Sequence, residues 1–212
     1  REAEYYYSGR TTYQTQLTGK YVWDASRMDW SAGYAYANRD LPDRRRYTLD
    51  NQLDPKQVGL TTGNEITREF TRLDEHIASA GVNYRRDFRQ GRVRPQLLAG
   101  AYGEYRTRTY NTRSFIYQWD PADNALPTGF RYMDLPTQLL QPQYYGDEGL
   151  YLIDDTKLRN DYRGHYWLGA AYASVNVPIG PFNVFAGLRY EHSHLQLVRN
   201  TRDYEYHWEK HL

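Results

Sequence analysis

The sequence contains no cysteine, no long hydrophobic run and almost no net charge. Without cysteine, the chain can form neither a disulfide framework nor a thiolate metal site. No segment approaches the roughly 18 apolar residues that a transmembrane helix needs, and the opening residues REAEYYYSGR lack the apolar core of a signal peptide. The formal net charge of +1 gives no reason to expect nucleic acid as a partner.

Recognisable catalytic and cofactor motifs are also missing. The sequence has no phosphate-binding loop, no G-x-G-x-x-G, no G-x-S-x-G and no H-E-x-x-H, so we predict neither an enzyme nor a cofactor. An alternative is that Glu104 and Glu191 form an acid pair with Arg189 as a clamp, as in a glycosidase. Charge pairs that line a water-filled interior explain the same three residues.

Two weak metal signals remain. His192 and His194 are two residues apart on one expected strand, so both side chains point the same way and could share a metal. No third ligand is evident nearby, and polar strand ends explain the pair equally well. The acidic segments GDEG (146–149) and DD (154–155) offer oxygen ligands for calcium, but their spacing does not match an EF-hand loop. We therefore predict no metal site.

The residues that are abundant favour β-structure. Tyrosine contributes 23 of 212 residues and aromatic residues 16%, and the patterned segments are rich in Tyr, Thr, Val and Gly, whereas long helical stripes are scarce. The sequence predicts a single all-β segment over 1–212. Its six expected strands span 10–22, 28–39, 66–87, 93–113, 157–177 and 182–199.

The connections between these strands alternate in length. Short turns (WDASR, FRQGR and PIGP) follow the first, third and fifth strands, whereas the segments 40–65 and 114–156 are long. Loops beyond about 15 residues are uncommon in compact domains. With antiparallel neighbours, all short turns fall at one end of the sheet and all long loops at the other.

Each expected hairpin has an apolar face beside its short turn and charged residues further away. In NVFAGLRYEHSHLQL (183–197), Val184, Ala186, Leu188 and Tyr190 alternate with residues that are polar or small apart from Phe185, and EHSH follows. A hydrocarbon slab produces this gradient, because an outer-membrane barrel has an apolar band about 25 Å tall with short turns on one side and long loops on the other.

The sequence therefore predicts an antiparallel, long-stranded meander that is part of a transmembrane outer-membrane β-barrel. The opposite face of the band would line a wet lumen. Four charged residues are the expected lumen-lining positions: Arg85, Glu104, Arg189 and Glu191.

Two segments resemble a known family. YWLGAAYASVNVPIGPFNVFAGLRYEHSHLQL (166–197), with its Pro/Gly turn and GxRYE strand, and LLAGAYGEYRTRTYNTRSFIY (97–117) resemble the barrels of TonB-dependent outer-membrane receptors, in the style of the Bacteroides group. The resemblance implies a barrel of about 22 strands, closed by a plug domain, that imports a scarce nutrient with energy relayed by TonB. Six strands and no plug imply a fragment of such a receptor in the outer membrane of a Gram-negative cell.

The long segments hold the expected ligand contacts. Aromatic faces among turn residues suit sugars, peptides or metal chelates, and packing of the loops on each other is the alternative explanation. These aromatic residues are Tyr117, Trp119, Phe130, Tyr132, Tyr144 and Tyr145. The basic segment DLPDRRRYTLD (40–50) could attract an anionic ligand or lipopolysaccharide phosphate, or could be a solvated loop with local ion pairs.

Two other classes stay open from the sequence alone. One is a soluble all-β module that binds carbohydrate or another ligand, with its oily faces packed as two sheets. The other is a small closed barrel, which needs about eight strands. The expected partners of the preferred reading are outer-membrane lipid, an extracellular ligand, and TonB through a plug domain that this chain lacks. Open sheet edges would also permit self-association.

Overall fold

The computed structural model describes residues 2–48, 66–89, 93–119, 141–142, 150–199 and 205–211. In these residues the chain is built from β-strands: β1 (Glu2–Tyr5), β2 (Gly9–Trp23), β3 (Ser26–Thr48), β4 (Ile66–Asp87), β5 (Gln96–Trp119), β6 (Leu150–Asp154), β7 (Tyr162–Ile179), β8 (Phe182–Arg199) and β9 (Glu205–His211). A short 3-10 turn, η3, spans Leu158–Asn160. The described part contains no helix long and apolar enough to cross a membrane.

The predicted all-β fold of long antiparallel strands is confirmed. The sheet is antiparallel wherever strand pairs are recorded, and β3, β4 and β5 each exceed 20 residues, against about 5–6 for a typical strand. The chain divides into two compact units. Unit 1 comprises Arg1–Arg10, Arg39–Arg72 and Asn111–Asp161, and unit 2 comprises Thr11–Asn38, Leu73–Tyr110 and Tyr162–Leu212.

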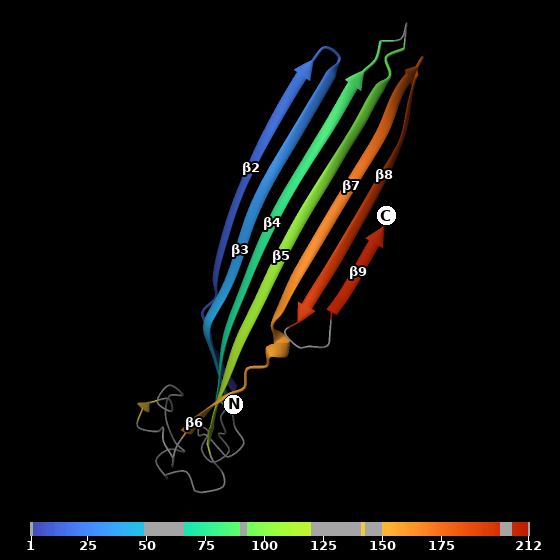
Figure 1. The fold of residues 1–212 in the computed structure, drawn as a ribbon. Helices are drawn as coiled ribbons and strands as arrows, with labels where there is room; N and C mark the ends of the chain where they lie inside the picture. Colours follow the sequence, from blue (N-terminus) through green and yellow to red (C-terminus); the bar gives the residue numbers. More distant parts are fainter. Residues whose placement is uncertain are drawn as a thin grey trace. The chain divides into compact units, whose positions relative to one another are not determined.

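Unit 2 is one sheet in the order β2-β3-β4-β5-β7-β8-β9 (Figure 1). Two-residue turns join β2 to β3 at Asp24 and Ala25, and β7 to β8 at Gly180 and Pro181. Asp24 (φ 46°) and Gly180 (φ 60°) adopt the left-handed backbone conformation, which Gly and Asp tolerate better than most residues. Figure 1 shows both turns at the same end of unit 2. The alternation of short and long connections predicts that the short turns share one end.

Several strand bounds differ from the prediction. β4 and β8 have the predicted ranges, but β3 continues to Thr48 instead of ending at 39, and β5 continues to Trp119 instead of 113. The continuations were mistaken for loop because of their Pro and charge content. They are strands because β1 pairs with the end of β3 and β6 pairs with the end of β5, which satisfies their backbone groups.

The predicted fifth strand also begins too early. Residues Leu158–Asn160 form the η3 turn, in which Asn160 N–H donates to the Lys157 carbonyl at 2.9 Å and Asp161 N–H to the Leu158 carbonyl at 3.0 Å. The strand β7 therefore begins at Tyr162 rather than at 157.

Unit 1 holds almost all of the buried hydrophobic side chains among the described residues. Tyr47 and Ile66 are fully buried, and Leu41 and Tyr117 are nearly so. The Tyr5 ring meets Tyr47 edge-on at 5.8 Å between centroids. This is a small aromatic core, and it contrasts with unit 2, where Ala170 alone among the described hydrophobic residues is classed as buried.

An ion-pair cluster lies beside this core in unit 1. Arg68 donates two hydrogen bonds to the Asp43 carboxylate, at 2.8 and 2.9 Å, and a third to the Tyr117 hydroxyl at 3.1 Å. Arg45 donates to Asp43 as well. Burial raises the pKa of Asp43, but the hydrogen bonds from Arg68 and Arg45 outweigh it, so the pKa lies below its usual value.

Acid is expected to weaken this cluster. Because the pKa of Asp43 is lower in the folded state, its contribution to stability is present above the unfolded pKa of about 3.9 and is lost as the pH falls through the folded value. We expect Asp43→Asn to cost on the order of 1 kcal/mol at pH 7 and less than that at pH 2. Denaturant unfolding at both pH values measures this, with Asp24→Asn in the β2–β3 turn as the control. An equal cost at both pH values would contradict the assignment.

Unit 2 has two chemically different faces. The register of β5, β7 and β8 places Ala99, Ala173 and Leu188 in one row across three strands, and Tyr102, Ala170 and Glu191 in a row on the opposite side. The Tyr172–Asn83 hydrogen bond places the odd-numbered residues of β4 on the second side, so His76 lies on the first side, and its hydrogen bond to Tyr34 extends that side to β3. We call the first side the apolar face and the second the polar face.

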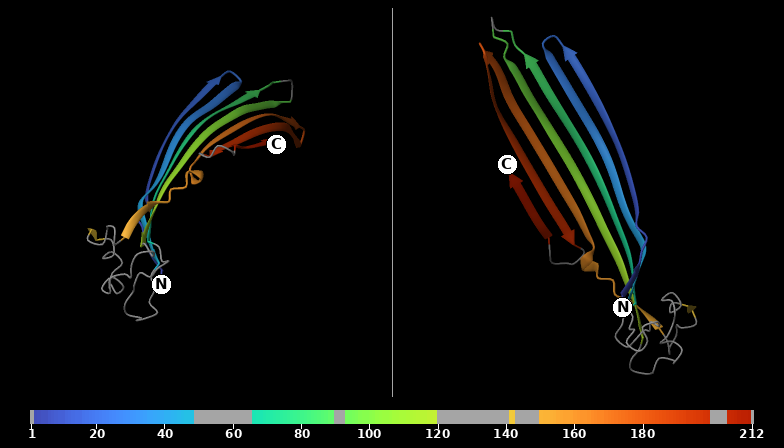
Figure 2. Two further views of the ribbon diagram at one scale, coloured as in Figure 1. Left: turned by 60° about the horizontal axis from the view of Figure 1, so that its bottom comes forward. Right: turned by 180° about the vertical axis from the view of Figure 1, so that it is seen from behind.

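The apolar face is exposed over six strands. Its large hydrophobic residues retain much of their accessible surface, with Leu188 79%, Phe182 72% and Leu17 66% exposed. Others on this face are Tyr13, Tyr21, Trp23, Tyr34, Val82, Trp167, Val175, Val184 and Tyr190. Figure 2 shows unit 2 as a single curved layer, and none of its described strands lies over this face. The apolar face therefore carries the largest apolar surface of unit 2 without a protein layer against it.

Candidate functional site

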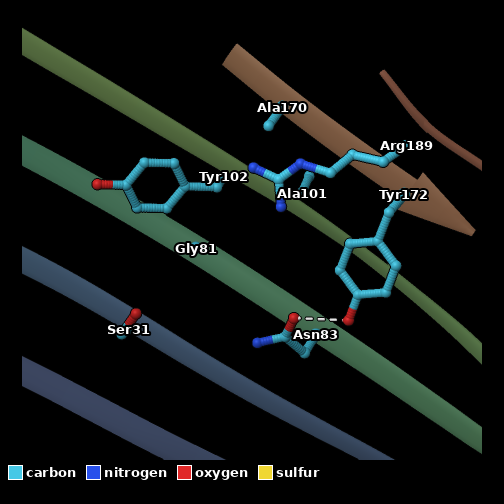
Figure 3. A pocket seen from close by; sticks show the side chains of 8 residues that line it. All are labelled: Ser31, Gly81, Asn83, Ala101, Tyr102, Ala170, Tyr172 and Arg189. Carbon is cyan, nitrogen blue, oxygen red and sulfur yellow. Dashed lines mark hydrogen bonds between the residues drawn. The ribbon is translucent and has the colours of Figure 1, made fainter. Parts of the chain in front are cut away.

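The polar face of unit 2 carries a shallow hollow formed by five neighbouring strands. Its volume is about 260 Å³. The residues that line it are Ser31 of β3, Gly81 and Asn83 of β4, Ala101 and Tyr102 of β5, Ala170 and Tyr172 of β7, and Arg189 of β8 (Figure 3). Small residues in the centre create the hollow, and the large side chains stand around it.

Two tyrosines and one arginine give the hollow its chemistry. The Tyr172 hydroxyl donates to the Asn83 Oδ1 at 2.8 Å, across β5 from one strand to another. Figure 3 shows the side chains of Tyr102, Tyr172 and Arg189 extending from three strands around the hollow. Aromatic rings with an amide and a guanidinium suit a polar organic group or a peptide side chain rather than a purely apolar ligand.

Glycine at position 100 makes room for Tyr172. A Cβ atom at this position would lie 2.4 Å from the Tyr172 Cε1 and 2.8 Å from the Asn83 Oδ1, so neither side chain could keep its place. The close approach explains why a residue without a side chain occupies the middle of a long strand.

Gly100→Ala is therefore expected to break the Tyr172–Asn83 hydrogen bond and to lower the free energy of unfolding by about 1 kcal/mol. Gly81→Ala is the matched control, because it lies in the same hollow and its Cβ would meet Tyr102 at an ordinary 3.4 Å. Denaturant titration of both variants measures the difference. Equal stabilities would show that Tyr172 moves aside without cost.

A chain of charged residues continues from the hollow along the polar face. The Tyr102 hydroxyl donates to the Glu104 carboxylate at 2.7 Å, and Arg106 donates to the same carboxylate at 3.0 Å. Glu75 accepts a hydrogen bond from Arg108 at 3.0 Å and lies 3.6 Å from the Nε of Arg106. The Glu75 side chain is only 11% exposed, so two guanidinium groups compensate a carboxylate that is largely removed from water.

The four predicted lumen-lining residues all lie on this polar face. Arg189 pairs with Glu191 at 2.6 Å, Glu104 pairs with Arg106, and Arg85 pairs with Asp87 at 3.1 Å. Each pair is made on a single strand between residues two positions apart. Glu104 and Glu191, which form the acid pair of the glycosidase alternative, are thus each engaged by an arginine on their own strand.

The predicted ligand-binding aromatics are placed differently. Tyr117 lies in β5, is 6% exposed and accepts a hydrogen bond from Arg68, so it belongs to the core of unit 1 and not to an exposed loop surface. Trp119 ends β5, with its backbone paired to Leu150. The remaining four, Phe130, Tyr132, Tyr144 and Tyr145, lie outside the described residues.

Sequence reasoning did not find four residues of the polar face that form hydrogen-bonded or ion pairs. These residues are Glu75, Arg106, Arg108 and Tyr172. Their alternation was available as a signal, because residues 104, 106 and 108 share one face of a strand. The contacts of these residues with neighbouring strands could not be predicted from the sequence, because they depend on the register between the strands. Among the side chains that the structure describes, no group of three or more His, Asp or Glu residues is arranged to hold a metal ion.

Comparison with known proteins finds likenesses among solved structures. No family model matches the chain, and no curated protein matches it. Among solved structures, the chain is similar to the crystal structure of the siderophore receptor PiuA from Acinetobacter baumannii, with 12% identity and a TM-score of 0.48, covering 97% of this chain and 29% of that chain. The chain thus spans less than a third of that receptor.

Proposed function

We propose that the chain is part of the wall of an outer-membrane β-barrel, with the apolar face of unit 2 against lipid and the polar face toward a water-filled lumen. The single observation that supports this proposal is the exposure of the apolar face. Soluble monomers rarely expose contiguous apolar patches larger than a few hundred Å². Here large side chains such as Leu188 and Phe182 stand exposed on one side of a sheet whose other side carries charged pairs such as Arg189–Glu191.

The extent of the apolar face fits a bilayer. On β8 the apolar face runs from Phe182 to Tyr190, and polar residues begin at His192. A barrel strand needs about 9–11 residues to cross the hydrocarbon. Aromatic residues lie toward both ends of the band. Trp23 and Tyr84 lie near the short turns, with 6.1 Å between ring centroids, and Tyr105 and Trp167 lie at the far border, with 4.1 Å between theirs. Aromatic girdles of this kind mark the two interfaces of outer-membrane barrels.

The polar face fits a lumen equally well. Its charges form local pairs such as Arg189–Glu191, and those side chains remain partly open to solvent, with Arg189 61% exposed. On this proposal Arg85, Glu104, Arg189 and Glu191 line the aqueous interior.

The parent protein, on this proposal, is a receptor or transporter of the TonB-dependent kind in a Gram-negative outer membrane, and not an enzyme. It would bind a sugar, peptide or metal chelate outside the cell, with Trp119, Phe130, Tyr132, Tyr144 and Tyr145 among the candidate contacts, and it would import that ligand with energy from TonB. These finer roles rest on the resemblance of the hairpin sequences to such receptors.

The soluble alternative makes a different demand on the apolar face. A binding module built as two packed sheets would bury that face against a second layer. Within the described residues, the strands of unit 2 form one layer, so nothing in this part of the chain favours the sandwich.

Fractionation of cells that express the parent protein tests the proposal. An antibody to this segment should detect it in the outer membrane, resistant to extraction by carbonate and urea. Recovery in a soluble fraction without detergent would overturn the proposal and favour the binding module.

A further inference from the structure

The hollow on the polar face adjoins a second hollow in the same unit. The first, around Tyr172, has a volume of about 260 Å³. The second lies on β2, β3 and β4, has a volume of about 380 Å³, and includes Lys20 and Asp29 in its lining. Ser31 and Asn83 line both hollows. The two therefore form one continuous depression in unit 2, which we call the polar groove.

We propose that the polar groove binds a neutral oligosaccharide, with one sugar ring in each hollow. The inference rests on the proposed function, because it takes the polar face to be open to an aqueous lumen, and it selects one ligand class from the three named there. Sites for drug-sized ligands have volumes of about 300–1,000 Å³. Hollows of about 260 and 380 Å³ lie at or below the lower end of this range, so each suits a single ring.

The tyrosines of the groove suit the apolar face of a sugar ring. A pyranose presents C–H groups on its faces and hydroxyl groups around its rim, and a tyrosine offers an apolar ring face with a polar tip. Tyr102 is 39% exposed, and Tyr172 is held across β5 by its hydrogen bond to Asn83 at 2.8 Å. A side chain that is already fixed loses little conformational freedom when a ligand packs on it.

The charged residues beside the tyrosines form pairs, and pairs favour a neutral ligand. Arg189 and Glu191 lie 2.6 Å apart, and Arg106 and Glu104 lie 3.0 Å apart. Each pair places hydrogen-bond donors next to acceptors, which matches the hydroxyl groups of a sugar because a hydroxyl both donates and accepts. An anionic chelate would have to displace a carboxylate from its arginine, with loss of charge-assisted hydrogen bonds.

The position of the groove disfavours an extended peptide. Such a peptide commonly binds a sheet by adding a strand to an open edge, where backbone groups are unpaired. The first hollow lies on β3, β4, β5, β7 and β8, each of which has a neighbouring strand on both sides. A ligand there is recognised by side chains alone, which removes the main advantage of a peptide.

An array of neutral and anionic oligosaccharides, probed with the unsubstituted parent protein in detergent, tests the inference without any variant. We expect binding to a neutral oligosaccharide, with an affinity that changes less than about twofold between about 0.05 and about 0.5 M NaCl, because a neutral ligand is not screened by salt. Binding only to anionic oligosaccharides, or to none on the array, would overturn the inference.

Variants of the two tyrosines locate the site. Tyr102→Ala and Tyr172→Ala should each lower the affinity for the bound oligosaccharide by about tenfold or more, whereas Tyr172→Phe, which keeps the ring, should lower it by less than about threefold. Tyr190→Ala is the matched control, because Tyr190 lies next to Arg189 in β8 but on the apolar face, opposite Ala171. Its affinity should be unchanged. Equal losses in Tyr172→Ala and Tyr190→Ala, or no loss in either groove variant, would contradict the site.

Fractionation of the same cells separates this inference from the proposed function. A protein that is found in the outer membrane but binds no oligosaccharide overturns the inference alone and leaves the proposed function standing. Recovery in a soluble fraction without detergent overturns both.

Discussion

Replacing Leu188 with arginine is expected to make folding into a bilayer less favourable by about 2–4 kcal/mol, the cost of a cationic side chain on the lipid face of a barrel near the midplane. Leu188 is the most exposed large hydrophobic residue of the apolar face, at 79%. On a soluble sheet the same change at an exposed position would alter stability by about 0.5 kcal/mol or less. Urea-dependent folding into phospholipid vesicles measures the difference.

Phe185→Arg is the matched control for Leu188→Arg. Phe185 lies three residues earlier in β8, is 68% exposed, and falls on the polar face because it is paired with Asn176. The proposed lumen accommodates a charge there, so we expect a change of about 0.5 kcal/mol or less. Equal costs for the two variants would contradict the assignment of the faces.

Gly19→Ala is expected to lower the free energy of unfolding by about 1–3 kcal/mol, the usual cost of inserting an extra carbon where the packing leaves no room. A Cβ atom at Gly19 would lie 2.1 Å from the Nε1 of Trp30 and within 2.7 Å of two further indole atoms. The rigid indole of β3 therefore covers β2 at this point and would have to leave its position. Denaturant titration, with tryptophan fluorescence as the signal, measures the loss.

Gly103→Ala controls for the change of residue type. Gly103 is in the interior of β5, and its Cβ would meet only the Leu168 carbonyl at 3.9 Å. Because alanine restricts the unfolded chain, this variant should be neutral or slightly more stable, by up to about 1 kcal/mol. A destabilisation equal to that of Gly19→Ala would show that Trp30 is not the cause.

The alternation of side chains could be predicted from the sequence because it is local. In β8 each residue's face follows from its parity, and Val184, Ala186 and Leu188 do share the apolar face with Ala173 of the neighbouring strand. The decline of apolar character toward His192 is local in the same way. These features needed no knowledge of which strands are neighbours.

The ends of the long strands could not be predicted because their pairing is not local. Pro42 and the arginines at 44–46 indicate a loop when they are considered alone. In the structure Arg44 pairs with Glu4 of β1 and with Glu69 of β4. Charges that suggest solvent in the sequence are thus matched by partners 25 or 40 residues away.

The candidate sites depended even more on register. Tyr172 and Asn83 are 89 residues apart and meet only because β4, β5 and β7 are neighbours. A shift of one residue in either register would move these partners to the other face.

Site-directed spin labelling tests the central claim most directly, and these 212 residues contain no cysteine of their own. Single cysteines placed in turn at 183–190 are labelled in the parent protein in lipid, and collisions with oxygen and with a water-soluble nickel complex are measured. We predict strict alternation, with 184, 186 and 188 open to oxygen and closed to nickel, and 183, 185 and 189 the reverse. Equal access of nickel to both sets would contradict the placement of the apolar face against lipid.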